Sequence, residues 1–326
     1  MGIKTLRPIR ENPADYDAIE AYIARLFKET LYLPLLAELK ASPRKVLKNA
    51  YESLGDAILY GRIIYSKGVF TGKFTAQVSK ELKELGAKWD KGTWKIPQSK
   101  LPMNVRAAIS QSEARFIETL KKIDKKLSAV IPDEIADKFK AEKLFDRTLW
   151  HIDLDYKKAA KNLIVTPELS DRARAQIAEK YTDSLKLPIR GWVKDQVAKL
   201  RKDMKANFEK GQRFEGMIDV IQKSYGSSLK KAKFLARQET MLMMTSFKEA
   251  RYADAGITEY KWRCVTGTPA HKVRPMHKAL NDRSLKGEIF KFKEPPVDDP
   301  NGSRHNPGEN FNCRCVALGV LRFKKA

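Results

Sequence analysis

The sequence predicts an α+β protein that is mainly α-helical, with a small α/β module and a loop-rich C-terminal domain that contains β-structure. Apolar residues recur at helical spacing through most of residues 106–255, whereas short β-rich runs surround a single helix in residues 61–105. Glycine, proline, asparagine and aspartate gather in residues 256–326. A chain of 326 residues is longer than one core usually organises, so we expect these three domains to follow an N-terminal helical region, residues 1–60.

The N-terminal region opens with a clear helix signal. In ENPADYDAIEAYIARLF, Asn12 is a candidate N-cap, Pro13 takes the first helical position, and apolar residues follow at helical spacing: Ile19, Ile23, Leu26 and Phe27. The next segment, LYLPLLAEL, contains Pro34, which we expect to break or kink the helix. Its apolar surface around Leu31 to Leu39 is typical of a core segment and, less often, of a segment that docks on a partner.

The α/β module is predicted from a change of pattern after residue 60. Val78, Leu82 and Leu85 mark one face of a helix, and Gly86 is its expected end. The stretch AKWDKGTWKI that follows is typical of a β-hairpin. A module of about 50 residues usually needs neighbouring segments for stability, so we do not expect it to act as an independent enzyme.

The helical region contains several predicted helices. One is marked by Phe116, Leu120, Ile123 and Leu127, a second begins at VTPEL with Thr166 as its cap, and a third is marked by Trp192, Val197, Leu200, Met204 and Phe208. Then FEGMIDVIQKSYGSSLKKAKFLARQETMLMMTSF predicts a short helix, a break at Gly226 with Ser227 or Ser228 as a cap, and a long basic helix. A helix, a turn and a second helix in succession are too common in helical regions to imply sequence-specific recognition of DNA bases.

After Gly256 the helical pattern stops. ITEYKWRC alternates as a strand, with Tyr260, Trp262 and Cys264 on one face. The composition of EPPVDDPNGSRHNPGEN is that of a long irregular loop, which needs something to hold it in a compact domain.

Cysteine and histidine concentrate in this last domain, which contains Cys264, Cys313 and Cys315 and three of the four histidines, His271, His277 and His305. Thiolate and imidazole are the preferred ligands of zinc, so we predict a structural zinc site formed by Cys264, His277, Cys313 and Cys315. The C-x-C spacing is closer than the usual zinc pairs. Three buried inert thiols, or a disulfide between Cys264 and either of the other two, are the alternatives; a Cys313–Cys315 disulfide would be strained.

A catalytic interpretation uses many of the same residues. His271, His277 and His305, with Asp298 or Asp299, could form an open metal site of a metal-dependent nuclease or hydrolase, and a cysteine nucleophile with a histidine base is formally available. The sequence contains neither H-E-x-x-H, nor a nucleophile elbow, nor a glycine-rich phosphate loop. We therefore expect binding rather than catalysis.

The net charge of +24 and the isoelectric point near 9.8 predict attraction to polyanions, nucleic acid first. The stretch SSLKKAKFLARQET concentrates candidate phosphate contacts on a helix: Lys230, Lys231, Lys233 and Arg237. The alternatives are a solvated helix face, and structural ion pairs of Arg237 and Glu239 with neighbouring helices. No run approaches the roughly 18 apolar residues of a membrane span, and the start lacks the apolar core of a signal peptide, so we expect no membrane contact and a cytosolic chain.

Four short motifs follow one another in the C-terminal half: ARQET at 236–240, YKWRC at 260–264, VRPMH at 273–277 and NCRC at 312–315. In this order and spacing, the chain from about 185 to 318 resembles the phage Mu F-like family of minor head proteins, also called phage head morphogenesis proteins. Residues 61–102 also resemble the module that often precedes this domain.

The resemblance implies a minor capsid protein that is made in the host cytoplasm and resides in the virion, in the head interior or at the portal vertex. Its implied partners are the phage portal, other head proteins and double-stranded phage DNA, and its implied work is head assembly with a role in DNA packaging or ejection. Arg274, His277, Cys313 and Cys315 match the family motif. The acidic residue that commonly precedes the arginine is here Ala270, which weakens an acid-dependent catalytic role.

Overall fold

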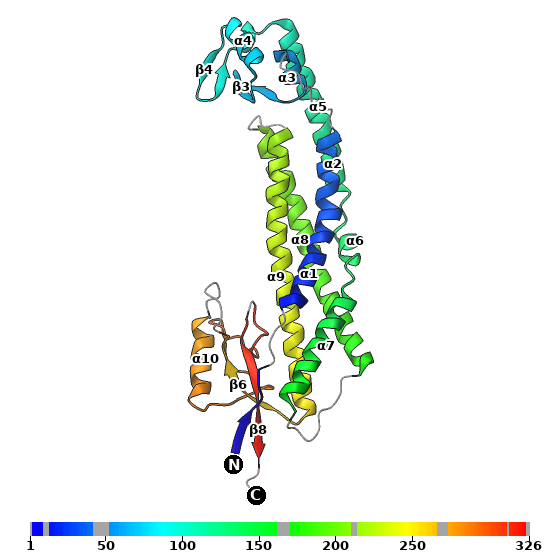
Figure 1. Ribbon diagram of the computed structural model, residues 1–326, viewed down its shortest axis with the longest axis vertical. Helices are drawn as coiled ribbons and strands as arrows, with labels where there is room; N and C mark the ends of the chain where they lie inside the picture. The colour runs from blue at the N-terminus through cyan, green and yellow to red at the C-terminus, as the bar shows by residue number, and fades with distance from the viewer. Residues whose placement is uncertain are drawn as a thin grey trace. The chain divides into compact units, whose positions relative to one another are not determined.

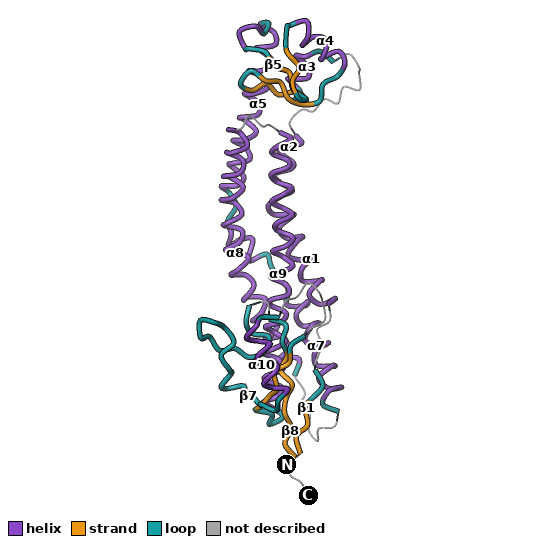
Figure 2. Tube along the Cα trace, turned by 90° about the vertical axis from the view of Figure 1, so that its left-hand side faces the viewer, coloured by secondary structure: helices purple, strands orange, loops and turns teal. Residues whose placement is uncertain are grey.

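The computed structural model describes residues 2–8, 13–41, 52–161, 170–209, 214–265, 273–311 and 313–323. Helices dominate these residues, and their strands form two four-stranded antiparallel sheets (Figures 1 and 2). The predicted mainly helical α+β class is confirmed. The chain divides into two compact units, each assembled from separate stretches: unit 1 contains Met1–Ala24, Ala136–Pro188 and Leu229–Ala326, and unit 2 contains Arg25–Ile135 and Ile189–Ser228.

The sheet of unit 1 joins the two ends of the chain (Figure 1). Its strand order is β1-β8-β6-β7, formed by β1 (Gly2–Thr5), β8 (Val316–Phe323), β6 (Glu259–Arg263) and β7 (Phe290–Lys291). The first and last strands pair from Gly2 opposite Phe323 to Thr5 opposite Val320. The predicted strand is confirmed, because Tyr260 and Trp262 of β6 are buried, as is Cys264 just after it.

Helix α10 (Pro275–Leu285) holds the end of β6. Because β7 pairs only with Glu259 and Tyr260, the later residues of β6 need other acceptors on that side. The Trp262 N–H donates to Ser284 Oγ at 2.8 Å, and the Cys264 N–H donates to Asn281 Oδ1 at 3.1 Å. Two side chains of α10 thus continue the hydrogen bonding of the strand and fix the helix beside it.

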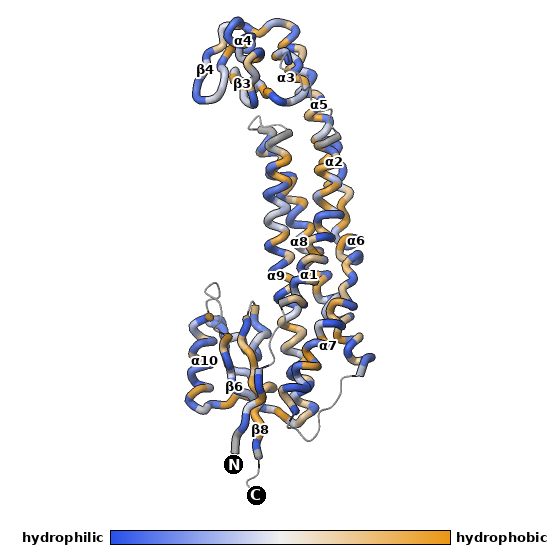
Figure 3. Tube along the Cα trace, viewed as in Figure 1, coloured by the Kyte–Doolittle hydropathy of each residue, from blue (hydrophilic) through white to orange (hydrophobic). Residues whose placement is uncertain are grey.

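Unit 1 also contains helices whose core includes polar and charged side chains as well as apolar ones. They are the first part of α1 (Pro13–Phe27), the end of α6 (Pro132–Asp137), α7 (Glu142–Ala159), the first part of α8 (Asp171–Glu209) and the last part of α9 (Phe214–Asp254). The fully buried Arg251 of α9 donates to Asp153 of α7 at 2.6 Å, and the Tyr156 hydroxyl donates to the Arg251 carbonyl at 3.1 Å. Apolar positions recur between polar ones along these helices (Figure 3), as amphipathic helices require.

Unit 2 contains the remainder of α1, a π-helical turn (Lys28–Tyr32), α2 (Leu33–Ala41) and α5 (Met103–Ser128), with the other parts of α8 and α9. Pro34 does not interrupt the helix. The wider turn before it, in which the Leu33 N–H bonds to the Lys28 carbonyl, accommodates the missing proline N–H. Most of the large apolar residues around Leu31 to Leu39 are buried, as expected of a core segment: Leu31, Tyr32, Leu35 and Leu39.

The predicted α/β module lies in unit 2. Its sheet has the order β2-β3-β5-β4, formed by β2 (Ile63–Ser66), β3 (Val69–Gly72), β5 (Thr93–Lys95) and β4 (Lys88–Asp90). The predicted hairpin is confirmed, with its turn at Lys91 and Gly92, and α4 (Ala76–Glu84) is followed by Gly86 at φ +78°. Helices α3 (Leu54–Leu59), a short 3-10 turn (Gln98–Lys100) and the start of α5 complete the module and its core.

The predicted break at Gly226 was wrong, because α9 continues from Phe214 to Asp254. Ser227 and Ser228 do not act as caps; their hydroxyls donate back to the carbonyls of Lys223 and Ser224. Tertiary packing of the helix outweighs the roughly 1 kcal/mol that a mid-helix glycine costs. The predicted helix start at Thr166 lies outside the described residues, and no helix that the structure describes is long and apolar enough to cross a bilayer.

Candidate metal centre

The register of the unit 1 sheet brings distant cysteines together. Arg263 of β6 pairs with Val316 of β8, so Cys264, which follows one strand, lies opposite Cys315, which precedes the other. Cys313 lies two residues further along the approach to β8. The third residue of α10 is His277, and the bonds from α10 to the end of β6 place this helix at the same point.

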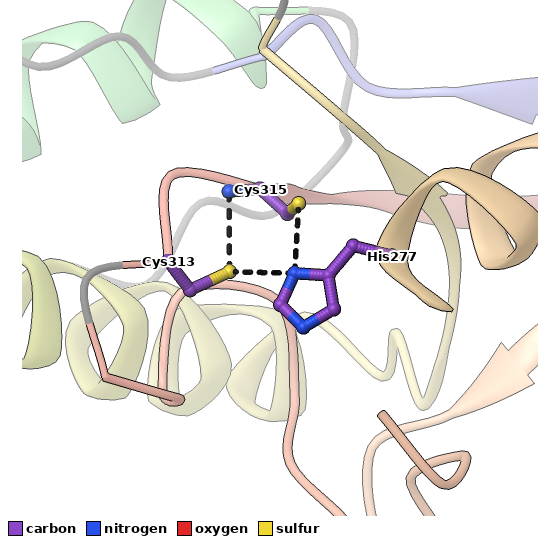
Figure 4. A group of neighbouring side chains, drawn as sticks. All are labelled: His277, Cys313 and Cys315. Carbon is purple, nitrogen blue, oxygen red and sulfur yellow. Dashed lines mark hydrogen bonds between the residues drawn. The ribbon is translucent and has the colours of Figure 1, made fainter. Parts of the chain in front are cut away.

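His277, Cys313 and Cys315 form a compact trio (Figure 4). The His277 Nδ1 atom lies 3.5 Å from the sulfur of Cys313 and 3.6 Å from the sulfur of Cys315, and all three atoms lie within 4.8 Å of one another. Zinc–sulfur bonds of about 2.3 Å and zinc–nitrogen bonds of about 2.0–2.1 Å in a tetrahedron put neighbouring N and S ligands about 3.6 Å apart. The spacing of these donors therefore fits tetrahedral zinc.

Cys264 lies beside this trio. Its sulfur is 3.5 Å from the sulfur of Cys315, and its thiol donates to the His277 carbonyl at 3.2 Å. All three cysteines are free thiols in the structure. The four residues predicted as ligands are thus neighbours, with three in one compact group and Cys264 in contact with one of them.

Asp298 and its partners form a second layer around His277. The Asp298 side chain is fully buried, and its Oδ2 atom lies 3.3 Å from His277 Nε2. The same carboxylate accepts hydrogen bonds from His305 Nδ1 and Asn310 Nδ2, each at 2.8 Å. The catalytic alternative assigned His305, with Asp298 or Asp299, to an open metal site; in the structure, Asp298 and His305 hydrogen-bond to each other within the loop.

The polar loop 294–310 also contacts α9. The Thr245 hydroxyl donates to the Pro307 carbonyl at 3.4 Å. Gly308 has φ +97°, and a Cβ there would lie 2.3 Å from Thr245 Oγ1, so only glycine fits this close approach. The long loop is therefore held both by the second layer of the cluster and by packing on the helix.

The electrostatics of the cluster favour a thiolate at Cys313. Hydrogen bonding from Cys315, aided by His277 and opposed by burial, lowers the pKa of the Cys313 thiol to about 4. Burial lowers the pKa of His277, but its hydrogen bond and charge interaction with Cys313 outweigh burial and raise it overall. Hydrogen bonds with the Cys264 and Cys313 sulfurs raise the pKa of Cys315. A thiolate is the form that a metal binds.

The burial of the trio limits what it can do chemically. His277 is 2% exposed, and Cys313 and Cys315 are each 4% exposed. A thiolate beside a histidine could act as a nucleophile, but a substrate would have to reach it. Asp299 accepts a bond from the Asn301 N–H within its own turn, and His271 and Ala270 lie outside the described residues. The arrangement suits a closed crosslink between segments.

The predicted DNA-contacting residues occupy different environments on α9. Lys230 and Lys233 are exposed. Lys231 lies over the Phe234 ring at 5.4 Å, and half-buried Arg237 lies over the Tyr16 ring at 5.1 Å. Glu239, a candidate ion-pair partner in the sequence, is buried and accepts a hydrogen bond from the Ser184 hydroxyl at 3.2 Å.

The comparisons with known proteins concern the same part of the chain. The family described as phage Mu protein F like protein matches residues 198–318, which include α10 and all four predicted zinc ligands. An uncharacterized protein of Haemophilus influenzae (strain ATCC 51907 / DSM 11121 / KW20 / Rd) is 35% identical over 92 residues, which cover 28% of this chain and 18% of that protein. The chain thus matches less than a fifth of that relative's length, and no solved structure matches it. Over residues 198–318, a little more than a third of the chain, the sequence is thus similar to the phage Mu protein F like proteins.

Proposed function

We propose that this protein is a minor head protein of a double-stranded DNA phage, which acts in head morphogenesis by binding. The observation that carries the proposal is the family match over residues 198–318. The proposed partners are the portal and other head proteins, and the proposed location is the head interior or the portal vertex, after assembly in the host cytoplasm. A role in packaging or ejecting the genome follows from that location.

The buried cluster of His277, Cys313 and Cys315 supports a role in binding and not in catalysis. The ligand atoms of His277, Cys313 and Cys315 face one another in the core of unit 1, and the nearby carboxylate of Asp298 is occupied by donors from its own loop. A metal-dependent nuclease needs a metal position that a phosphodiester can reach. The nuclease alternative predicts cleavage of DNA incubated with the protein and Mg²⁺ or Zn²⁺, whereas we expect intact DNA.

We also propose that the cluster binds one structural zinc ion, with His277, Cys313 and Cys315 as ligands and Cys264 as the fourth. The ion would supply a crosslink between the end of β6, the start of α10 and the approach to β8. Such a crosslink would hold the loop-rich segment between α10 and β8, which has little apolar core of its own.

The zinc proposal is tested by metal analysis of the full chain purified in reducing buffer. We expect about one zinc per chain, and loss of zinc with a lower melting temperature in Cys313→Ser and His277→Ala. His151→Ala is the matched histidine control, because His151 bonds to Asp15, away from the cluster. A wild-type chain without bound metal, or variants that retain full zinc, would contradict the site.

The morphogenesis proposal is tested by deleting the gene from the phage that encodes it and examining the assembly products by electron microscopy. We expect few filled, infectious heads, and recovery when the wild-type gene is supplied in trans. A deletion strain with a normal yield of DNA-filled, infectious particles would refute the proposed role.

A further inference from the structure

Asp298 gathers polar groups from separate parts of the C-terminal fold. Its Oδ1 atom accepts a hydrogen bond from His305, its Oδ2 atom accepts one from Asn310, and Oδ2 also lies 3.3 Å from His277 Nε2. The carboxylate is fully buried. Burying a carboxylate is costly unless donors or positive charge surround it, so the identity of each neighbouring donor matters.

His277 presents its two ring nitrogens to two different environments. Its Nδ1 atom faces the sulfurs of Cys313 and Cys315, as Figure 4 shows. Its Nε2 atom is enclosed and lacks an aligned hydrogen bond, with the Asp298 carboxylate as the acceptor beside it. A neutral imidazole has a proton on one nitrogen and a lone pair on the other, so an acceptor at Nε2 leaves the lone pair at Nδ1.

We infer that Asp298 is the positioning residue of the zinc site: it accepts the Nε2 proton of His277 and so presents the Nδ1 lone pair to the metal. This inference rests on the zinc site proposed above. Histidine ligands commonly donate their second N–H to a carboxylate or carbonyl, which fixes both the tautomer and the ring orientation. A slight rotation of the ring would align the hydrogen bond across the 3.3 Å contact.

The same carboxylate links the polar loop to the metal ligand. His305 and Asn310 belong to the loop segment that precedes Cys313, and both donate to Asp298. Orientation of His277 and order of the loop therefore depend on one side chain. A residue that only stabilised the loop would affect unfolding, but it would not determine which nitrogen of His277 binds zinc.

The first test compares Asp298→Asn with the matched control Asp299→Asn in the full chain. Asp299 is the adjacent carboxylate, and it accepts its bond from Asn301 within a turn. Zinc affinity is measured by competition with a chromophoric chelator in reducing buffer. We expect affinity about 10- to 100-fold weaker in Asp298→Asn, and unchanged affinity in Asp299→Asn. Equal affinities of wild type and Asp298→Asn would overturn the inference and leave the zinc site standing.

The second test needs no variant, so it applies even if Asp298→Asn does not fold. Long-range ¹H–¹⁵N correlation spectra of zinc-loaded, ¹⁵N-histidine-labelled wild-type protein report which His277 nitrogen binds metal. We expect zinc at Nδ1 and a proton at Nε2, with the assignment made from His277→Gln. Zinc at Nε2 would overturn the role of Asp298. A wild-type chain that binds no zinc would overturn both the site and the inference.

Discussion

Glu239, which is buried, and Asp153, which is partly buried, are two carboxylates of unit 1 with different surroundings. Asp153 faces the guanidinium of Arg251 at 2.6 Å. Glu239 accepts its hydrogen bond from a neutral group, the Ser184 hydroxyl, and burial raises the pKa of its carboxyl by more than this bond lowers it. A raised pKa in the folded state means that this residue stabilises the fold most when protonated, and that the stabilisation is lost as pH rises through the folded-state pKa.

Glu239→Gln should therefore raise the free energy of unfolding at neutral pH, by on the order of 1 kcal/mol. Glutamine carries no charge, and its side-chain oxygen can still accept from Ser184. The gain should shrink as pH falls and should be lost well below the unfolded-state pKa of about 4.3, where glutamate is protonated in both states. Denaturant unfolding of wild type and Glu239→Gln, at neutral pH and below the unfolded-state pKa of glutamate, measures the difference in the free energy of unfolding.

The control for Glu239→Gln is Glu118→Gln on α5, because the Glu118 side chain is 66% exposed and its ion pair with Lys122 lies at the surface. An exposed pair of this kind contributes roughly 0.3–0.5 kcal/mol. A stability change in Glu239→Gln of the same size at both pH values would show that burial of its charge has no energetic effect.

Among the elements, α9 has several roles along its length. Near its start, Ser224 accepts a hydrogen bond from Gln196, and Ser228 lies 2.5 Å from the Tyr32 hydroxyl in the core of unit 2. Near its end, Thr245 and Arg251 hold the polar loop and α7 in unit 1. Between these contacts the helix exposes Lys230 and Lys233. The exposed lysines thus lie on the part of α9 that belongs to unit 1.

This exposed stretch of α9 should contribute to DNA binding through phosphate contacts. The double variant Lys230→Ala/Lys233→Ala should bind duplex DNA more weakly, and the slope of log affinity against log salt should fall by up to about two, since each phosphate contact contributes about 0.9. Fluorescence anisotropy across a salt series measures both effects.

Lys88→Ala/Lys91→Ala is the matched control for α9, because it removes the same charge from exposed positions on the hairpin of the α/β module. We expect a smaller change in slope for this control. Equal losses from the two double variants would mean that net charge, and not the position of the lysines on α9, determines binding.

At the scale of the whole molecule, residue type and spacing predicted the fold class and which side chains lie near His277. Because thiolates and imidazole are preferred zinc ligands, the sequence predicted that Cys264, Cys313 and Cys315 lie near His277. The alternation of apolar and polar residues predicted the strand β6. The hairpin at Lys91 and Gly92 was likewise predictable, since its turn needs residues that accept positive φ.

Features that depend on distant parts of the chain were not predictable. The pairing of β1 with β8 joins the first residues to the last, and no local pattern indicates such a partner. The burial of Asp298 beside His277 depends on how a loop folds back on α10. A helix break was wrongly predicted at Gly226, because the contacts that hold α9 there, such as the hydrogen bond from Gln196 to Ser224, come from residues far away in the sequence.

We propose that this chain is a head protein that works by binding inside the particle. Quantitative mass spectrometry of purified, nuclease-treated particles of the encoding phage, with the protein then located by cryo-electron microscopy, tests it most directly. We expect the chain to be present in far fewer copies than the major capsid protein, at the inner head surface or the portal vertex. Purified, infectious particles that contain none of this chain would contradict it.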